Sequence, residues 1–319
     1  MKRTPLLASL AVVAATALAG CGGGDEALNT DSGSGGDSGG STSALVVGSA
    51  NFPENALLAE IYAGALNGAG IDAETKLNIG SRETYIPGIK DGSIDVLPEY
   101  TGNLRLYFCC PENGPASNVD KYAKATDPAG VYQELKNTLP DGMMVLDYAE
   151  AQDKDAVVVT QATADKYSLT EIGDLADVAG DLTLGGPPEW KTRFTGVPGL
   201  KKVYGVEFGD FTETDAGGPL ALKALTDDRV QAANLFTTDP NIAANDLVVL
   251  DDPKSLFAAQ NVVPLLTKDA DNPDVEDALN AVSDALDTTT LGGLVKQVVI
   301  DKEDPEDVAK QFLDDNNLS

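Results

Sequence analysis

Short apolar runs alternate with amphipathic segments along most of the chain after Ala44. The run at 156–159 is apolar at every position, which is typical of a strand buried on both faces of its sheet. The segment 55–67 places its leucines and its isoleucine mostly on one face at helical spacing. Repeated alternation of strands and helices predicts an α/β fold with mainly parallel sheets.

The same pattern gives an expected position for each element. Strands are expected at 45–48, 75–79, 94–97, 143–146, 156–159, 182–184, 247–250 and 262–266. Helices are expected at 55–67, 84–90, 120–139 with a break near Asp127, 199–204, 219–225 and across 273–313.

These elements group into two α/β lobes. We expect the first lobe to comprise residues 44–152 plus 258–319, and the second to comprise 153–257, inserted between those parts. Two chain crossings then form a hinge, and a ligand would bind between the lobes.

The N-terminus carries a targeting signal. Lys2 and Arg3 precede an apolar stretch at 6–18 that is too short to span a membrane. The sequence Leu-Ala-Gly-Cys ending at Cys21 looks like a bacterial lipobox, with ordinary secretory cleavage nearby as the alternative. Residues 1–20 are therefore expected to be a lipoprotein signal peptide and Cys21 the lipid anchor. Residues 21–43 are expected to be a disordered Gly/Ser tether outside the cell membrane.

Charge and composition exclude several classes of function. The 319 residues include 51 acidic and 22 basic side chains, for a net charge of −29, so binding of nucleic acid through its phosphates is excluded. Contact with the membrane is expected only through the lipid. The chain has no histidine, which removes Ser-His-Asp and Cys-His catalysis and imidazole metal ligands. No catalytic residue, cofactor or metal is expected, and the protein is expected to be a monomer.

Cys109 and Cys110 are adjacent in the sequence. They either form a vicinal disulfide in an oxidising exterior or remain thiols. No second cysteine pair is present to complete a metal site, so we interpret the pair as a loop staple.

Two loops at predicted strand ends carry candidate binding chemistry. Asn51 offers a donor and an acceptor, Phe52 an apolar face, and the following helix start offers N–H groups to a carboxylate. The alternative is a helix cap with a packed phenylalanine. Tyr100 follows a strand, and its ring suits a quaternary ammonium group through cation–π contact. The alternative is a buried tyrosine whose hydroxyl is satisfied.

Three motifs then point to one family. GSANFPE at 48–54, GSRE at 80–83 and EYTG at 99–102 resemble the substrate-binding proteins of ABC importers for glycine betaine, choline and carnitine. The resemblance implies a bilobed periplasmic-binding-protein-like fold of type II. It implies that the two lobes close around an osmoprotectant and that the protein delivers this solute to a permease and its ATPase. It also implies that the protein is located at the outer face of the cell membrane.

Site residues follow from the motifs and the resemblance together. The resemblance implies that Tyr100 belongs to an aromatic cage lined also by Thr101, and that Thr238 or Asp239 closes over the ligand. The expected set is Asn51, Phe52, Glu83, Tyr100, Thr101, Trp190, Phe236, Thr238 and Asp239. Ser81 is expected to cap a helix.

The chain also departs from the family's pattern. Asn55 replaces the usual glutamine, and Leu97 stands where some relatives carry tyrosine, so a cage of four tyrosines is not evident. Choline, carnitine and a proline-like zwitterion therefore remain open beside glycine betaine. Alternatives are a receptor for another polar solute and a ligand-sensing lipoprotein without transport. An enzyme with paired carboxylates is the third alternative, drawn from Glu54, Glu83, Glu99, Glu189 and Asp239.

Overall fold

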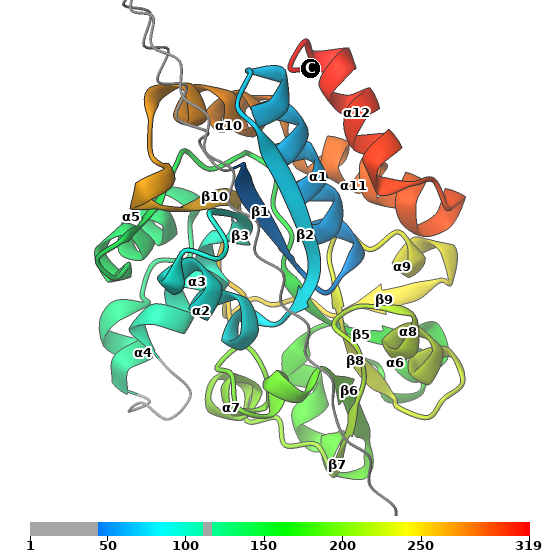
Figure 1. Cartoon of the computed structure of the whole chain (residues 1–319). Coiled ribbons are helices and arrows are strands. Elements are labelled where there is room, and N and C mark those ends of the chain that lie inside the picture. The colour runs from blue at the N-terminus through cyan, green and yellow to red at the C-terminus, as the bar shows by residue number, and fades with distance from the viewer. Residues whose placement is uncertain (1–43, 111–116) are drawn as a thin grey trace, which may run out of the picture. The chain divides into compact units, whose positions relative to one another are not determined.

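A computed structural model describes residues 44–110 and 117–319 (Figure 1). The expected signal peptide and tether lie outside the described residues. The described chain forms two five-stranded sheets, each with its own helices, in a bilobed fold of the periplasmic-binding-protein type II class. The predicted fold class is thereby confirmed.

The first lobe is built on the sheet with strand order β2-β1-β3-β10-β4. Its strands are β1 (Leu45–Ala50), β2 (Ala73–Gly80), β3 (Val96–Tyr100), β4 (Met143–Val145) and β10 (Val262–Thr267). Its helices are α1 (Pro53–Gly68), α2 (Arg82–Asp91), α3 (Thr101–Cys109), α4 (Ser117–Tyr122), α5 (Pro128–Thr138), α10 (Pro273–Ala285), α11 (Thr288–Lys296) and α12 (Pro305–Asn316).

The second lobe is built on the sheet with strand order β7-β6-β8-β5-β9. Its strands are β5 (Asp155–Thr160), β6 (Thr183–Gly186), β7 (Asp210–Glu213), β8 (Ala232–Phe236) and β9 (Leu247–Val249). Its helices are short: α6 (Gln161–Tyr167), α7 (Val197–Gly199), α8 (Pro219–Thr226) and α9 (Asn241–Ala244).

Both sheets are mixed, and each is mainly parallel as predicted, with one strand running against the other four. β1 is parallel to β2 and β3, but β10 is antiparallel to both β3 and β4. In the second sheet β5 is antiparallel to β8 and β9. The antiparallel strands β5 and β10 are those that follow the two chain crossings. The crossing segments pair with each other where Gln152 meets Asn261.

The first strand after α2 lies further along the chain than predicted. It was expected to end at Leu97, but β3 continues through Glu99 to Tyr100, and every residue of it is buried. A carboxylate is tolerated there because Glu99 is neutralised by the buried Arg82, at 2.7 Å between Nη2 and Oε2. This extension puts Tyr100 at the carboxyl end of a central strand.

Each sheet has its own apolar core. In the first lobe α1 buries Leu57, Ile61 and Leu66 against β1, β3 and the C-terminal helices. In the second lobe Val157, Leu184 and Trp190 belong to a separate core. In the described part of the chain, no helix has the length and apolarity needed to cross a membrane.

Candidate functional site

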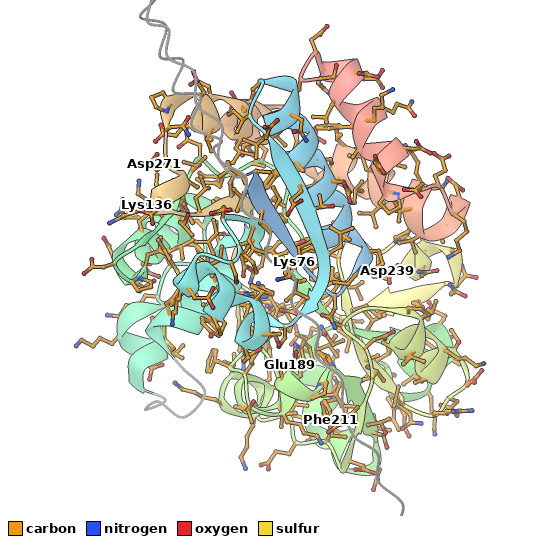
Figure 2. All side chains as sticks on the ribbon, in the orientation of Figure 1. Lys76, Lys136, Glu189, Phe211, Asp239 and Asp271 are labelled. Atoms are coloured by element: carbon orange, nitrogen blue, oxygen red, sulfur yellow. A yellow bond between two sulfur atoms is a disulfide. The ribbon has the colours of Figure 1, made fainter. Side chains whose placement is uncertain are left out.

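Side chains from both lobes converge on a cavity of about 60 Å³, which we call the inner cavity. Several of its walls are at the carboxyl ends of strands, where open α/β sheets bind ligands. Its aromatic lining consists of Phe52, Tyr85, Tyr100, Trp190 and Phe236. Its acidic lining consists of Asp153, Asp155 and Glu189, and Figure 2 labels Glu189 where the two lobes meet.

The turn from β1 into α1 holds two of the predicted residues at this cavity. Asn51 and Phe52 both line it, and Pro53 starts α1 where its missing N–H costs nothing. The side chain of Asn55 closes the turn: Oδ1 accepts from the Ala50 N–H at 2.6 Å and Nδ2 donates to the Pro98 carbonyl at 2.9 Å. Phe52 occupies the N-cap position without a side-chain cap. The helix-cap alternative for this loop is therefore wrong.

Three aromatic rings bridge the lobes beside the inner cavity. The Phe52 ring centroid lies 5.0 Å from that of Phe236 and 6.1 Å from that of Tyr100. Trp190 is 1% exposed, and its ring stacks on Phe257 at 6.1 Å, so most of it serves the core of the second lobe. The aromatic wall thus combines a bridging cluster with one edge of a core tryptophan.

A buried pair of carboxyl groups lies behind these rings. Glu54 accepts hydrogen bonds from the Tyr100 hydroxyl at 2.7 Å and from the Thr238 hydroxyl at 2.6 Å. Asp153 accepts from the Thr238 N–H at 3.0 Å. Burial raises the pKa of Glu54, and burial together with the charge of Glu54 raises the pKa of Asp153 well above its usual range. A ligand cation beside Asp153 would therefore favour its ionised form.

Asp155 is the second buried carboxylate of the inner cavity. Its two oxygens accept hydrogen bonds from Asn103 Nδ2 at 2.9 Å and from Asn234 Nδ2 at 3.0 Å. Asn103 belongs to α3 of the first lobe and Asn234 to β8 of the second. These amides fix the Asp155 side chain in one orientation beside the aromatic wall.

The GSRE and EYTG motifs meet in one buried network. Arg82 donates from Nε to Oε1 of Glu99 at 3.0 Å, and the Tyr85 hydroxyl donates to the same oxygen at 2.6 Å. The backbone N–H of Tyr100 donates to Oε2 at 3.0 Å. This network fixes the end of β3, and with it the direction of the Tyr100 ring.

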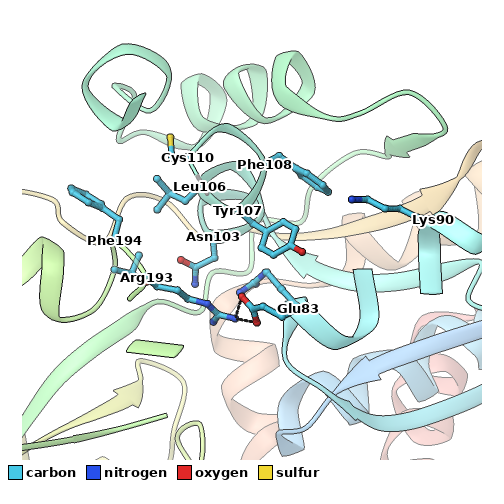
Figure 3. Close-up of a pocket in the computed structure, with 11 residues that line it drawn as sticks. Glu83, Lys90, Asn103, Leu106, Tyr107, Phe108, Cys110, Arg193 and Phe194 are labelled. Carbon is cyan, nitrogen blue, oxygen red and sulfur yellow. Dashed lines mark hydrogen bonds and ion pairs between the residues drawn. The ribbon is translucent and has the colours of Figure 1, made fainter. Parts of the chain in front are cut away.

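A second ion pair joins the lobes at the edge of the inner cavity. Arg193 Nη2 donates to Glu83 at 2.7 and 3.1 Å, as the dashed lines in Figure 3 show. Partial burial of Glu83 opposes its ionisation, but the charge of Arg193 and the hydrogen bonds from Ser81 and Arg193 together outweigh burial and lower the pKa of Glu83. The Ser81 hydroxyl donates to Glu83 at 2.6 Å and makes no cap hydrogen bond, so the prediction of a serine cap is wrong.

With this geometry in place, the comparisons with known proteins decide the family. The family model described as "Substrate binding domain of ABC-type glycine betaine transport system" matches residues 43–315. The chain belongs to this family. It is the substrate-binding component of an osmoprotectant ABC importer, and it binds solute without catalysing a reaction.

Individual relatives agree with this assignment. The glycine betaine-binding protein YehZ of Escherichia coli K12 is 28% identical over 85% of this chain and 90% of its own length. A glycine-betaine-binding protein of Pseudomonas aeruginosa is 25% identical over 86% of this chain and 88% of its own length. The crystal structure of a glycine betaine/carnitine/choline ABC transporter protein covers 86% of this chain and 99% of its own, with a TM-score of 0.63 at 23% identity, and supports the fold.

Not every residue expected from the family's motifs lines the inner cavity. Asn51, Phe52, Tyr100, Trp190 and Phe236 do.

The remaining predicted residues lie elsewhere. Thr101 is fully buried and binds the second chain crossing, because its hydroxyl accepts from the Asn261 N–H at 3.1 Å. Glu83 lines a neighbouring cavity. Thr238 and Asp239 line a third cavity of about 220 Å³, where the Asp239 carboxylate accepts from the Asn241 N–H at 2.8 Å.

The family motifs also left residues of the inner cavity unnoticed. Arg82 and Tyr85 stand inside or beside GSRE but look like ordinary helix residues. Asp153 and Asp155 stand just before the apolar strand at 156–159. Their position next to a fully buried strand was the one sign in the sequence that they could belong to the site, because polar residues at such a position lie at the edge of the sheet.

Two further sequence questions are answered by the described residues. Cys109 and Cys110 form a disulfide at the end of α3, which decides between the two alternatives. Among residues 44–110 and 117–319, no group of three acidic or cysteine side chains is arranged to hold a metal ion.

Proposed function

We propose that this chain captures a compact zwitterion with a quaternary ammonium head, with glycine betaine as the representative, in the inner cavity. One observation carries the proposal: aromatic rings from both lobes surround a cavity that also contains the carboxylates Asp153 and Asp155. A quaternary ammonium offers no hydrogen bond, so its recognition requires aromatic faces and nearby negative charge.

The zwitterion's carboxylate requires donors on another side of the cavity. Arg193 commits only Nη2 to Glu83, so its other guanidinium donors stay available to an anion, and Asn51 lines the same cavity. The backbone N–H groups at the start of α2 add to this positive side. The separation of acidic and basic walls favours a zwitterion over a simple cation.

Capture would proceed by closure of the lobes about the two crossings. We place the first lobe at residues 44–152 plus 258–319 and the second at 153–257. Contacts across the boundary support closure as the step that completes the site: Phe52 with Phe236, Glu54 with Thr238, and Glu83 with Arg193. The closed form would then deliver its solute to the importer's permease and ATPase.

Calorimetric titration of the purified full chain tests this proposal. The ligand panel consists of glycine betaine, choline, carnitine and proline. The matched control is 3,3-dimethylbutanoate, which has the shape of glycine betaine but carries a neutral carbon in place of the charged nitrogen. We expect glycine betaine to bind and the carbon isostere to bind at least tenfold more weakly, since only the ammonium gains cation–π and ionic attraction, about 2 kcal/mol when desolvated. Equal binding of the two would refute recognition of the onium charge.

We further propose that a lipid on Cys21 holds the protein at the outer face of the cell membrane. The support is the sequence Leu-Ala-Gly-Cys after an apolar segment. Mass spectrometry of the mature N-terminus tests it: a diacylated cysteine at position 21 is expected, and Cys21→Ser should release the protein from membranes. An unmodified N-terminus elsewhere would contradict the anchor.

A further inference from the structure

A second and larger cavity adjoins the inner cavity. It has a volume of about 400 Å³, within the range of small-molecule sites, and we call it the outer cavity. Arg82, Asn103 and Arg193 line both cavities. The two cavities therefore share three side chains, and a ligand in the inner cavity contacts side chains that also line the outer one.

The walls of the outer cavity are mostly apolar. Leu106, Tyr107 and Phe108 project from α3 of the first lobe, and Phe194 comes from the second lobe (Figure 3). All four are partly exposed, and the rings of Tyr107 and Phe108 meet edge to face at 5.2 Å. These apolar side chains are partly exposed to water on a concave surface. Covering them with an apolar ligand segment lowers the free energy of the complex.

The outer cavity also has a positive side, in a protein whose net charge is −29. Lys90 lines it and forms no ion pair with any residue of the described chain. Figure 3 shows Lys90 on the same side of the cavity as Phe108. An anionic group at the far end of an apolar segment would find its counter-charge at this position.

The helix α2 sets the length of the path. Arg82, at its first residue, lines both cavities, and Lys90 lines only the outer cavity near the helix end. At 1.5 Å per residue the two backbone positions are about 12 Å apart. Glycine betaine, with one methylene between its charges, is too short to reach from the inner cavity to Lys90.

We propose that the outer cavity is a second compartment of the ligand site. It accommodates the tail of a longer quaternary ammonium compound, an apolar chain that ends in an anion. The trimethylammonium head occupies the inner cavity, the chain lies against Leu106, Phe108 and Phe194, and the anion pairs with Lys90. This inference rests on the proposed function, because it takes the inner cavity as the site of the onium head.

Trimethylammonium derivatives of acetate, butanoate, hexanoate and octanoate test the proposal by calorimetry on the full chain. The acetate derivative is glycine betaine itself. Beyond butanoate we expect the affinity to rise about fourfold per added methylene, the gain from burying one such group. A steady fall in affinity from acetate to octanoate would overturn the proposal.

Substitutions then locate the tail. Phe108→Ala should weaken the octanoate derivative by about tenfold or more and leave glycine betaine unchanged, because only the longer tail reaches that wall. Lys90→Gln should weaken the octanoate derivative about three- to fivefold, as expected for an exposed ion pair. It should not affect octyltrimethylammonium, which lacks the carboxylate.

Lys76→Gln is the matched control for charge, since Lys76 is exposed on β2 and lines neither cavity. Equal effects of Lys90→Gln and Lys76→Gln would overturn the assignment of Lys90. The series also separates the two proposals. If glycine betaine binds and affinity falls with chain length, only the second compartment fails. If no member binds, the onium site itself fails.

Discussion

The hydroxyl of Thr238 donates a hydrogen bond to Oε2 of Glu54 across 2.6 Å, and so joins the loop after β8 to the first turn of α1. The backbone N–H of the same threonine donates to Asp153 at 3.0 Å. Thr238 therefore donates hydrogen bonds to two buried carboxyl groups. One belongs to Glu54 of the first lobe, and the other belongs to Asp153, which follows the first crossing. The bond to Glu54 depends on the two lobes being together, whereas the bond to Asp153 lies within the second lobe.

Thr238→Val should weaken ligand binding. The valine keeps the shape of the side chain but removes the donor, so Glu54 loses a partner in a buried position at a cost of about 1–3 kcal/mol. Water replaces that partner when the lobes are apart, so the loss falls on the closed form and should reduce affinity for glycine betaine about fivefold or more. Calorimetry provides the measurement.

The exposed Thr226→Val on α8 is the matched control, because its hydroxyl binds only a carbonyl of its own helix. Affinity should be unchanged in this variant. If Thr238→Val also binds with unchanged affinity, the Glu54 contact has no part in closure.

Asp153→Asn should stabilise the unliganded protein at neutral pH. Because the pKa of Asp153 is raised well above its ordinary value of 3.8, the folded state holds this proton to higher pH than the unfolded chain, and the acid form favours the folded state. Its contribution is fully present below the ordinary value and is lost as the pH rises towards the raised pKa. Asparagine still accepts the hydrogen bond from the Thr238 N–H, and because its side chain does not ionise, its contribution to stability does not fall as the pH rises.

The measurement for Asp153→Asn is urea unfolding across pH. The variant should have a higher free energy of unfolding than the parent at neutral pH, and the difference should vanish at acid pH below the ordinary pKa range. A constant difference at all pH values would show that the group does not titrate as inferred. The same variant should bind glycine betaine more weakly, since a negative charge near the onium head is lost.

Glu99→Leu should be strongly destabilising. It leaves the guanidinium of Arg82, which is 9% exposed, without its counter-ion, and breaking a buried pair in this way costs about 3–5 kcal/mol. The double variant Arg82→Met with Glu99→Leu should recover part of that loss in urea unfolding. A double variant less stable than Glu99→Leu alone would contradict the inference that the unpaired charge is the cause.

Gly102→Ala should also destabilise the fold. A Cβ at Gly102 would lie 2.6 Å from the Ala259 carbonyl and 2.8 Å from Gln260 Nε2, so α3 would be pushed from the second crossing. We expect a loss of about 1–3 kcal/mol in urea unfolding. The control is Gly292→Ala in α11, where nothing lies within 4 Å of the added atom, and a gain of about 0.5–1 kcal/mol is expected. Equal effects at both positions would contradict the steric argument.

Much of the fold was predictable because it depends on local patterns. The apolar strand at 156–159 and the helical spacing of 55–67 appear in the structure as β5 and α1. The reversed direction of β5 and β10 was not predictable, because it depends on how the chain returns at its crossings. The extension of β3 through Glu99 was missed because Arg82, the residue that makes it possible, is 17 positions away.

The site was predictable only where a motif carried it. Asn51, Phe52 and Tyr100 were found through the loop and the strand end they occupy, and they line the inner cavity. Thr238 was found through a motif, but its partners Glu54 and Asp153 are distant in sequence and meet it only in the folded chain. Long-range carboxylate partners leave no periodic signal, so Asp153 and Asp155 needed the structure.

Trp190 allows the most direct test of whether glycine betaine binds in the inner cavity. It is the only tryptophan in the chain and it lines the inner cavity, so the tryptophan emission of the protein comes from a residue at that cavity. The full chain should be titrated with glycine betaine while Trp190 emission and heat are both recorded. The account predicts a saturable emission change with the same midpoint as the heat, and neither signal with 3,3-dimethylbutanoate at that concentration. Heat without any change in Trp190 emission, or no binding at all, would contradict it.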